Sequence, residues 1–97
     1  MKTIKEFTEV QFRRFRGEII AVFPYEIWNE NDVASYMHVG QHSGCFWGIN
    51  NNSKPVIKQE YMPLYNELVS IGYNLKIINR RNHSKYLQAY YAQKQAS

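Results

Sequence analysis

The chain lacks the features that would assign it at once to a class of protein. Its single cysteine, Cys45, excludes a disulfide bond within the chain. No segment approaches the roughly 18 consecutive apolar residues that a membrane-spanning helix needs. No basic leader followed by an apolar run opens the sequence. We therefore expect a cytoplasmic protein that does not insert into a membrane.

What the chain does have is the composition of a folded domain. Of its 97 residues, 44% are hydrophobic and 15% are aromatic, and charges of both signs are present. Chains that stay disordered combine low hydrophobicity with high net charge, so we expect residues 1–97 to fold as a single domain. Eight tyrosines, five phenylalanines and two tryptophans predict an aromatic core, although such rings also serve at interfaces.

Two-residue alternation predicts strands in the first half of the chain. Val10–Arg16 and Glu18–Tyr25 are expected to form a hairpin that turns at Arg16-Gly17. The second of these strands, apolar on both faces, should be central in the sheet and end near Pro24, since proline cannot donate to a ladder. Further along, we expect a surface loop over Glu26–Asp32, a third strand over Ala34–Gly40 and a short strand over Cys45–Ile49. Trp28, in the expected loop, either covers the edge of the core or is exposed for contact.

The second half changes to a helical period. Apolar residues recur at three and four positions from Tyr61 to Ile71, and Gly72 follows where a helix would end. Because proline is tolerated only in a first turn, Pro63 predicts that the regular helix begins near Met62. A last strand is expected over Tyr73–Asn79.

A C-terminal helix over residues 82–97 completes the predicted fold. Asn82, His83 and Ser84 supply capping chemistry, and the helix carries a stripe of Tyr86, Leu87, Tyr90 and Tyr91. This helix either packs on the sheet or joins a partner chain. The sequence thus predicts an α+β fold in which about four mainly antiparallel strands pack against one helix, with a further helix at the C-terminus.

Groups that can bind a ligand or do chemistry are concentrated between Tyr36 and Gly48. We take the tentative binding residues to be His38, Gln41, His42, Ser43, Cys45 and Trp47. The histidines and the cysteine raise two alternatives, a zinc site and a cysteine nucleophile with a histidine base. Zinc sites usually need four ligands and a close cysteine pair, and the sequence offers no orienting third group for a nucleophile. A glycine-bearing turn that binds an anion is a third alternative, although no phosphate-loop spacing is present.

Positive charge is concentrated in the later part of the chain. Residues 1–32 hold five basic and six acidic groups, whereas residues 33–97 hold seven basic and two acidic groups. Two basic clusters lie beside aromatic residues, an arrangement that could bind single-stranded nucleic acid. The first consists of Arg13, Arg14 and Arg16, and the second of Lys76, Arg80, Arg81 and Lys85. The alternative is that these charges protect solvated strand edges from pairing with other chains.

Three segments carry a resemblance to other proteins: AVFPYEIW, SYMHVGQHSGC and EYMPLYNELVSIGYNLKIINR. Over residues 18–81 the chain resembles a group of short proteins from gut bacteria, their phages and mobile elements. Ile57 departs from the threonine or serine cap expected before the helix. The resemblance implies a compact bacterial or phage cytoplasmic protein and carries no activity.

These observations favour a small, non-enzymatic binding module that uses no cofactor. We expect its partner to be another protein or a second copy of itself, bound through the His38–Trp47 segment. Nucleic-acid binding through the two basic clusters is the alternative. An enzyme or metal-binding protein that depends on Cys45 and the histidines is the third hypothesis.

Overall fold

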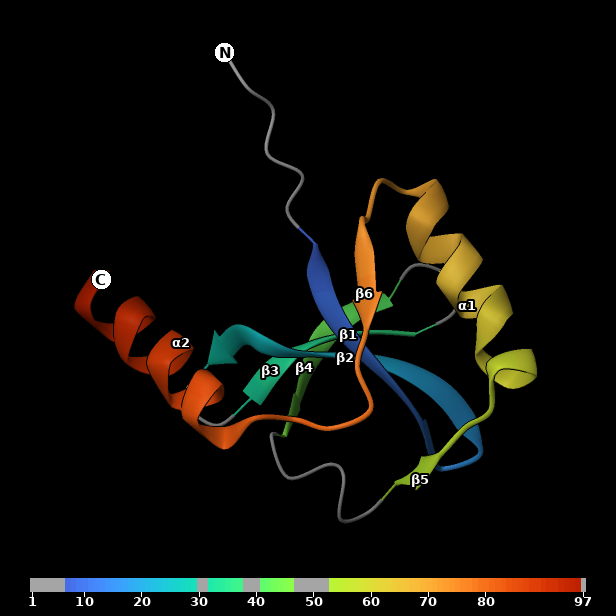
Figure 1. Ribbon diagram of the computed structural model, residues 1–97, viewed down its shortest axis with the longest axis horizontal. Coiled ribbons are helices and arrows are strands. Elements are labelled where there is room, and N and C mark those ends of the chain that lie inside the picture. Colours follow the sequence, from blue (N-terminus) through green and yellow to red (C-terminus); the bar gives the residue numbers. More distant parts are fainter. Residues whose placement is uncertain (1–6, 30–31, 38–40, 47–52, 97) are drawn as a thin grey trace.

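The computed structural model describes residues 7–29, 32–37, 41–46 and 53–96, which form an α+β fold. Six strands make one sheet, and a helix lies at each side of it (Figure 1). In chain order the elements are β1 (Thr8–Phe15), β2 (Glu18–Asn29), β3 (Asp32–Met37), β4 (Gln41–Phe46), β5 (Lys54–Pro55), α1 (Lys58–Ser70), β6 (Leu75–Ile77) and α2 (His83–Ala96). The predicted fold class is confirmed, with more strands than the four expected.

The strand order is β4-β3-β2-β1-β5, with β6 also paired to β1. The outer edge of β1 is covered in two pieces, because β6 pairs in parallel with Thr8–Val10 and β5 pairs antiparallel with Arg13 and Arg14. The other described strand pairs are antiparallel. As predicted, β2 lies in the middle of the sheet.

The hairpin between β1 and β2 turns where the sequence predicts. Arg16 and Gly17 both have positive φ, 53° and 80°, and Phe15 is opposite Glu18. Two successive residues with positive φ give the turn type whose twist matches that of the flanking strands. Glycine adopts this conformation without strain, so it suits the second position of the turn.

β2 continues beyond Pro24, so the prediction of a loop over Glu26–Asp32 is wrong for the residues that the structure describes there. The pairing of β2 with β3 shifts register between Phe23 and Ile27, and proline is tolerated at such irregularities. The irregularity also changes the alternation along the strand. Tyr25 and Ile27 therefore pack in the same cluster as Ile20 and Val22.

The other predicted strands exist with shifted ends. β3 ends at Met37, and residues 38–40 of the predicted third strand lie outside the described residues. β4 begins at Gln41, four residues before the predicted short strand, and residues 47–49 of that strand are not described. β6 is confirmed as a shorter strand than predicted, and β5 was not predicted.

One face of the sheet is covered by α1. Leu64 and Leu68 pack against Val10, Phe12, Ala21, Phe23 and Tyr36. The rings of Phe12 and Tyr61 stack at 4.6 Å between centroids, and the hydroxyl of Tyr36 donates to the carboxylate of Glu67. Helix, central strands and aromatic rings thus form the main core, as the composition predicts.

α1 begins at Lys58 rather than near the predicted Met62. The N-cap residue is Ile57, and its N–H donates to the Glu60 side chain at 3.1 Å. Glu60, in the first turn, satisfies a backbone donor there although the cap position has no polar side chain. Pro63 is accommodated inside the helix, and Gly72 follows the C-cap with a positive φ of 112°, as predicted.

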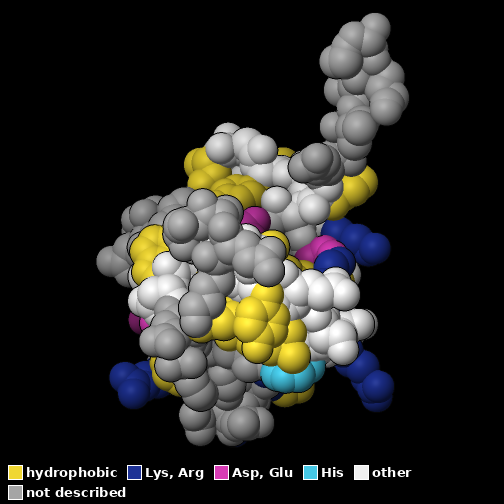
Figure 2. All heavy atoms as spheres, turned by 90° about the vertical axis from the view of Figure 1, so that its left-hand side faces the viewer, with side chains coloured by type: hydrophobic (Ala, Val, Ile, Leu, Met, Phe, Trp, Pro, Cys, Tyr) yellow, Lys and Arg dark blue, Asp and Glu magenta, His cyan; other side chains and the backbone are white. Residues whose placement is uncertain are grey.

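α2 covers the opposite face through its first turns. The Asn82 side chain accepts a hydrogen bond from the N–H of Lys85 at 3.0 Å, which confirms the predicted cap. Tyr86 is buried and packs with Leu87 against Ile20, Val22 and Val33. Farther along the helix, Tyr91 is 57% exposed. Figure 2 views the molecule from this side and shows hydrophobic side chains gathered there.

The core predicts a sharp difference between two neighbouring residues of α1. Leu68 has no exposed surface, whereas Val69 is 44% exposed. We expect Leu68→Ala to lower the free energy of unfolding by about 2–5 kcal/mol, because it leaves a cavity beneath the helix. Val69→Ala, the matched control, should change it by less than about 1 kcal/mol. Urea titration of both variants measures the difference, and equal losses would contradict this assignment of the core.

Candidate functional site

The strand β4 lies at the end of the sheet and pairs on one side with β3. The register is continuous from Asp32 opposite Phe46 to Met37 opposite Gln41. Among the described strands, no other strand pairs with β4. One side of this strand is therefore an open edge within that part of the chain.

The direction of the backbone groups on β4 follows from the sheet. In an antiparallel pair, hydrogen-bonded and non-hydrogen-bonded residue pairs alternate. The Thr8 N–H donates to Asn74, and the Val10 carbonyl accepts from Ile78, so even-numbered residues of β1 turn their backbone groups away from β2. The same alternation can be followed across the sheet, because the registers show which residues of β2, β3 and β4 are opposite each other. In β4 it turns the N–H and C=O groups of His42, Gly44 and Phe46 away from β3 and toward the open edge.

The two ends of the sheet differ in how they are protected. Natural sheets protect edge strands with proline, charge or a short length. β5 has all three, because it consists only of Lys54 and Pro55. β4, with the sequence QHSGCF, contains neither proline nor a lysine, arginine or carboxylate. Its chemistry does not discourage pairing with another strand.

Trp28 lies across β4 at Gly44. A Cβ atom placed on Gly44 would be 2.3 Å from Cδ1 and 2.7 Å from Cγ of the indole, so no side chain fits there. The tryptophan is nevertheless 49% exposed. The sequence left open whether Trp28 covers the edge of the core or is exposed for contact. The structure combines both, because the indole covers Gly44 and also presents aromatic surface beside the open edge.

The opposite face of β4 contains Cys45, near the buried Ser35. The Ser35 hydroxyl donates to the backbone carbonyl of Ser43 at 3.0 Å. Burial raises the pKa of the Cys45 thiol to about 11, and a hydrogen bond with Ser35 offsets part of this rise. The thiol is therefore protonated at neutral pH, whereas nucleophiles and metal ligands use the thiolate.

The tentative binding residues are only partly placed by the structure. His38 and Trp47 lie outside the described residues, and Gln41 and His42 contribute their backbone to β4. Ser43, which is exposed, and the partly buried Cys45 alternate with Gly44 and so share one face of the strand. Within residues 7–29, 32–37, 41–46 and 53–96, no group of three histidine, cysteine or acidic residues is placed to hold a metal ion.

The first basic cluster is divided between the two faces of the sheet. Arg13 donates to the side chain and the carbonyl of Ser53, at 2.9 and 2.8 Å. Arg14, its neighbour in β1, forms an ion pair with Glu60 of α1. The Arg16 guanidinium lies 5.0 Å from the centroid of the Phe15 ring. These three residues make separate contacts within their own chain.

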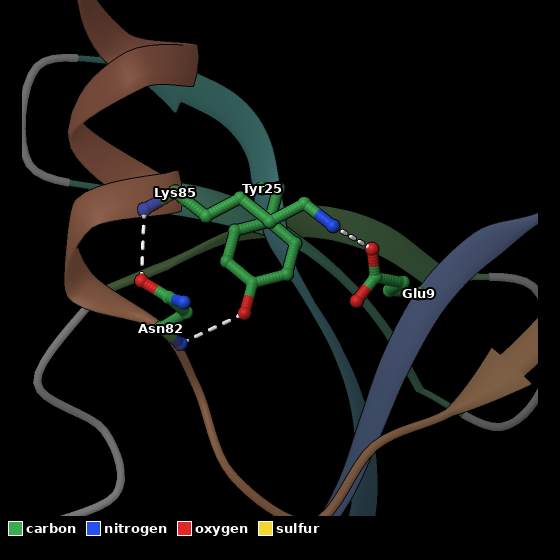
Figure 3. Close-up of polar contacts among 4 residues, drawn as sticks. All are labelled: Glu9, Tyr25, Asn82 and Lys85. Carbon is green, nitrogen blue, oxygen red and sulfur yellow. Dashed lines mark hydrogen bonds and ion pairs between the residues drawn. The ribbon is translucent and has the colours of Figure 1, made fainter.

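The second basic cluster is also divided. Lys85 pairs with Glu9 and lies 4.8 Å above the Tyr25 ring, while the Tyr25 hydroxyl accepts from the Asn82 N–H at 2.8 Å (Figure 3). These contacts attach the start of α2 to β1 and β2. Burial lowers the pKa of the Arg81 guanidinium, which lies near Cys45. Lys76 and Arg80 are exposed.

A cavity of about 250 Å³ opens where β5 and β6 leave the edge of β1 uncovered. Gln11 and Phe12 line it from β1, Val56 and Tyr61 from the α1 side, and Asn79 from the chain after β6. Gln11 is only 3% exposed, and its side-chain N–H donates to the Asn79 carbonyl at 3.0 Å. Sequence reasoning missed this residue, because an alternating strand gives no sign that its polar positions will be covered.

Comparison with family models, with curated proteins and with solved structures found no match to the chain. None of the helices in the described part of the chain is long and apolar enough to cross a membrane.

Because Trp28 contacts Gly44, the effect on stability of a substitution at Gly44 should depend on whether Trp28 is present. Gly44→Ala should lower the free energy of unfolding by about 1–3 kcal/mol, because its methyl group overlaps the indole. In a Trp28→Ala background the same change should lower it by much less, since the overlapping ring is gone. Urea titration of the two single variants and the double variant measures the coupling, and additive losses would disprove the contact.

The raised pKa of Cys45 predicts slow modification by iodoacetamide at neutral pH. The rate should increase about tenfold per pH unit between pH 7 and pH 10, because only the thiolate reacts. In urea the rate should level off near pH 9, close to the ordinary thiol pKa. The Cys45 thiol ionises at a lower pH in the unfolded chain than in the folded chain. The free energy of unfolding should therefore fall as the pH rises from about 9 toward 11. A plateau near pH 9 in the folded protein would contradict the effect of burial.

Proposed function

We propose that the protein is a small, non-enzymatic interaction module that binds an extended protein segment as an additional strand on β4. The observation that carries this proposal is the open edge of β4, which has no proline and no charged side chain. Strand addition obtains its affinity from main-chain hydrogen bonds and its specificity from neighbouring side chains. We also propose, from the resemblance alone, a bacterial or phage origin and a cytoplasmic location.

The site favours binding over bond-making for two reasons. The Cys45 thiol is protonated at neutral pH, and the outward-facing groups of His42, Gly44 and Phe46 are backbone donors and acceptors that match another strand. Trp28 adds an exposed aromatic surface beside them. Tryptophan is among the residues that most often dominate binding energy at protein interfaces.

Nucleic-acid binding is supported less well by the structure. Arg13, Arg14 and Lys85 contact Ser53, Glu60 and Glu9 of their own chain. Phosphate binding would have to compete with these contacts, and the adjacent positions of Arg13 and Arg14 in β1 point them to opposite faces. The open strand edge therefore remains the better-supported binding surface.

The proposal is tested with a capped peptide of alternating threonine and valine, which readily forms a strand. Titrated into dilute ¹⁵N-labelled protein, it should shift the amide signals of His42, Gly44 and Phe46, with a Kd of about 1 mM or tighter. A matched peptide with two valines replaced by proline should not bind, because it cannot form the ladder. The Lys54 signal should not move with either peptide.

A variant of the strand itself provides the second control. The N–H of His42 faces the open edge, so His42→Pro removes a donor that a partner strand would use but none that β3 uses. This variant should keep the fold, as judged by circular dichroism, and lose peptide binding. Shifts spread over other elements, or binding that is unchanged in His42→Pro, would disprove strand addition at β4.

A further inference from the structure

The open edge also indicates what binds to it, provided that strand addition at β4 is correct. We propose that the partner is a second copy of the chain, whose β4 pairs antiparallel with this one so that a single sheet runs through a symmetric dimer. The two-fold axis passes beside Gly44. This register pairs residues 42–46 of one copy with residues 46–42 of the other.

The register follows from which residues face outward. With Gly44 on the axis, it pairs with Gly44 of the second copy, and His42 pairs with Phe46 of the second copy. Each outward-facing residue then exchanges both backbone hydrogen bonds with its counterpart. Two-fold registers centred on Ser43 or Cys45 would also pair outward-facing residues with each other, but only the register centred on Gly44 pairs all three of His42, Gly44 and Phe46 within the described part of the strand. A two-fold interface needs such self-complementarity.

Charge does not oppose this pairing. Each chain has a net charge of +4, but Gln41–Phe46 contains no lysine, arginine or carboxylate, so two copies bring no like charges together along the strand. Charges elsewhere are screened over about 8 Å at physiological ionic strength. The opposite edge, with Lys54 and Pro55, lacks this compatibility.

Trp28 gives the second, independent observation. The ring lies over Gly44 and is half-exposed, so in the dimer the two Trp28 rings lie on the same face, near the axis. The paired glycines have no side chains to cover this part of the sheet, and the indoles cover it instead. Aromatic surface that is exposed in the monomer is thereby buried at the centre of the interface, where hot-spot residues are found.

The first experiment measures molar mass by light scattering over a protein concentration series from about 1 µM to 1 mM. The wild-type chain should change from monomer to dimer. Ser43→Lys places a positive charge on an exposed position of β4 and should raise the dissociation constant by about tenfold or more. Ser70→Lys makes the same change at an exposed position of α1 and should leave the dissociation constant unaltered.

The second experiment tests the register with disulfide bonds. In the proposed pairing, Ser43 is directly opposite Cys45 of the second copy in a non-hydrogen-bonded pair, with Cα atoms about 4.5 Å apart. This spacing is within the range of about 4.4–6.8 Å that disulfides span. Ser43→Cys should therefore form a covalent dimer under mild oxidation. In the double variant Ser43→Cys, Cys45→Ser, the introduced thiols are diagonal neighbours about 7–8 Å apart, and the yield should be several-fold lower.

The outcomes separate this inference from the proposed function. A chain that stays monomeric throughout the series overturns the dimer, while binding of the threonine-valine peptide to β4 would still support strand addition. A dimer that survives Ser43→Lys and fails to cross-link in Ser43→Cys uses another surface, which also overturns the inference. If neither a second copy nor the peptide binds at β4, both proposals are wrong.

Discussion

The structure depends on how the backbone groups at the edges of a sheet are satisfied. Every strand inside the sheet has hydrogen-bonding partners on both sides, and each edge strand must expose or cover one row of polar groups. The outer edge of β1 is covered by two short segments, β5 and β6, one antiparallel and one parallel. At the other end, β4 has no second neighbour among the described strands. The proposed interaction surface rests on this difference between the two ends.

A second constraint is that the central strand β2 must be apolar on both faces. Phe23 packs with α1 on one face, and Val22 packs with α2 on the other. The irregularity near Pro24 keeps the later part of the strand in the sheet and changes which residues face α2. Trp28 reaches Gly44 from this later part of β2.

Much of the fold follows from local sequence signals, and the departures have physical causes. The hairpin turn at Arg16-Gly17, the cap at Asn82 and the position of Gly72 are each determined by a few neighbouring residues. The strand beyond Pro24 depends on pairing with β3, which local patterns do not contain, whereas the start of α1 at Lys58 has a local signal, Glu60, that the weight given to Pro63 left unused. The strand β3 pairs with β2 beyond the proline, and the Glu60 side chain accepts a hydrogen bond from the N–H of Ile57, which needs no polar side chain at the cap position.

The candidate site overlaps the segment that the sequence singled out, but the groups proposed to bind are of another kind. Its polar, glycine-bearing sequence drew attention to Gln41–Cys45, and the sheet contains these residues. Composition suggested ligand-binding side chains, whereas the proposed surface consists of backbone groups of β4 and of Trp28, which is distant in sequence. Whether a strand is at an edge depends on the order of all the strands, and adjacent residues in the sequence do not determine that order.

The attachment of α2 has a consequence for how the protein opens. Its described contacts with the sheet are concentrated near its start, at Asn82, Lys85 and Tyr86, while Tyr91 is largely exposed. Loss of these few contacts would free the whole helix and leave the strand ladder intact. We therefore expect partial unfolding to begin here, with the C-terminal segment detaching as a unit and uncovering Ile20 and Val22 before the rest of the chain melts.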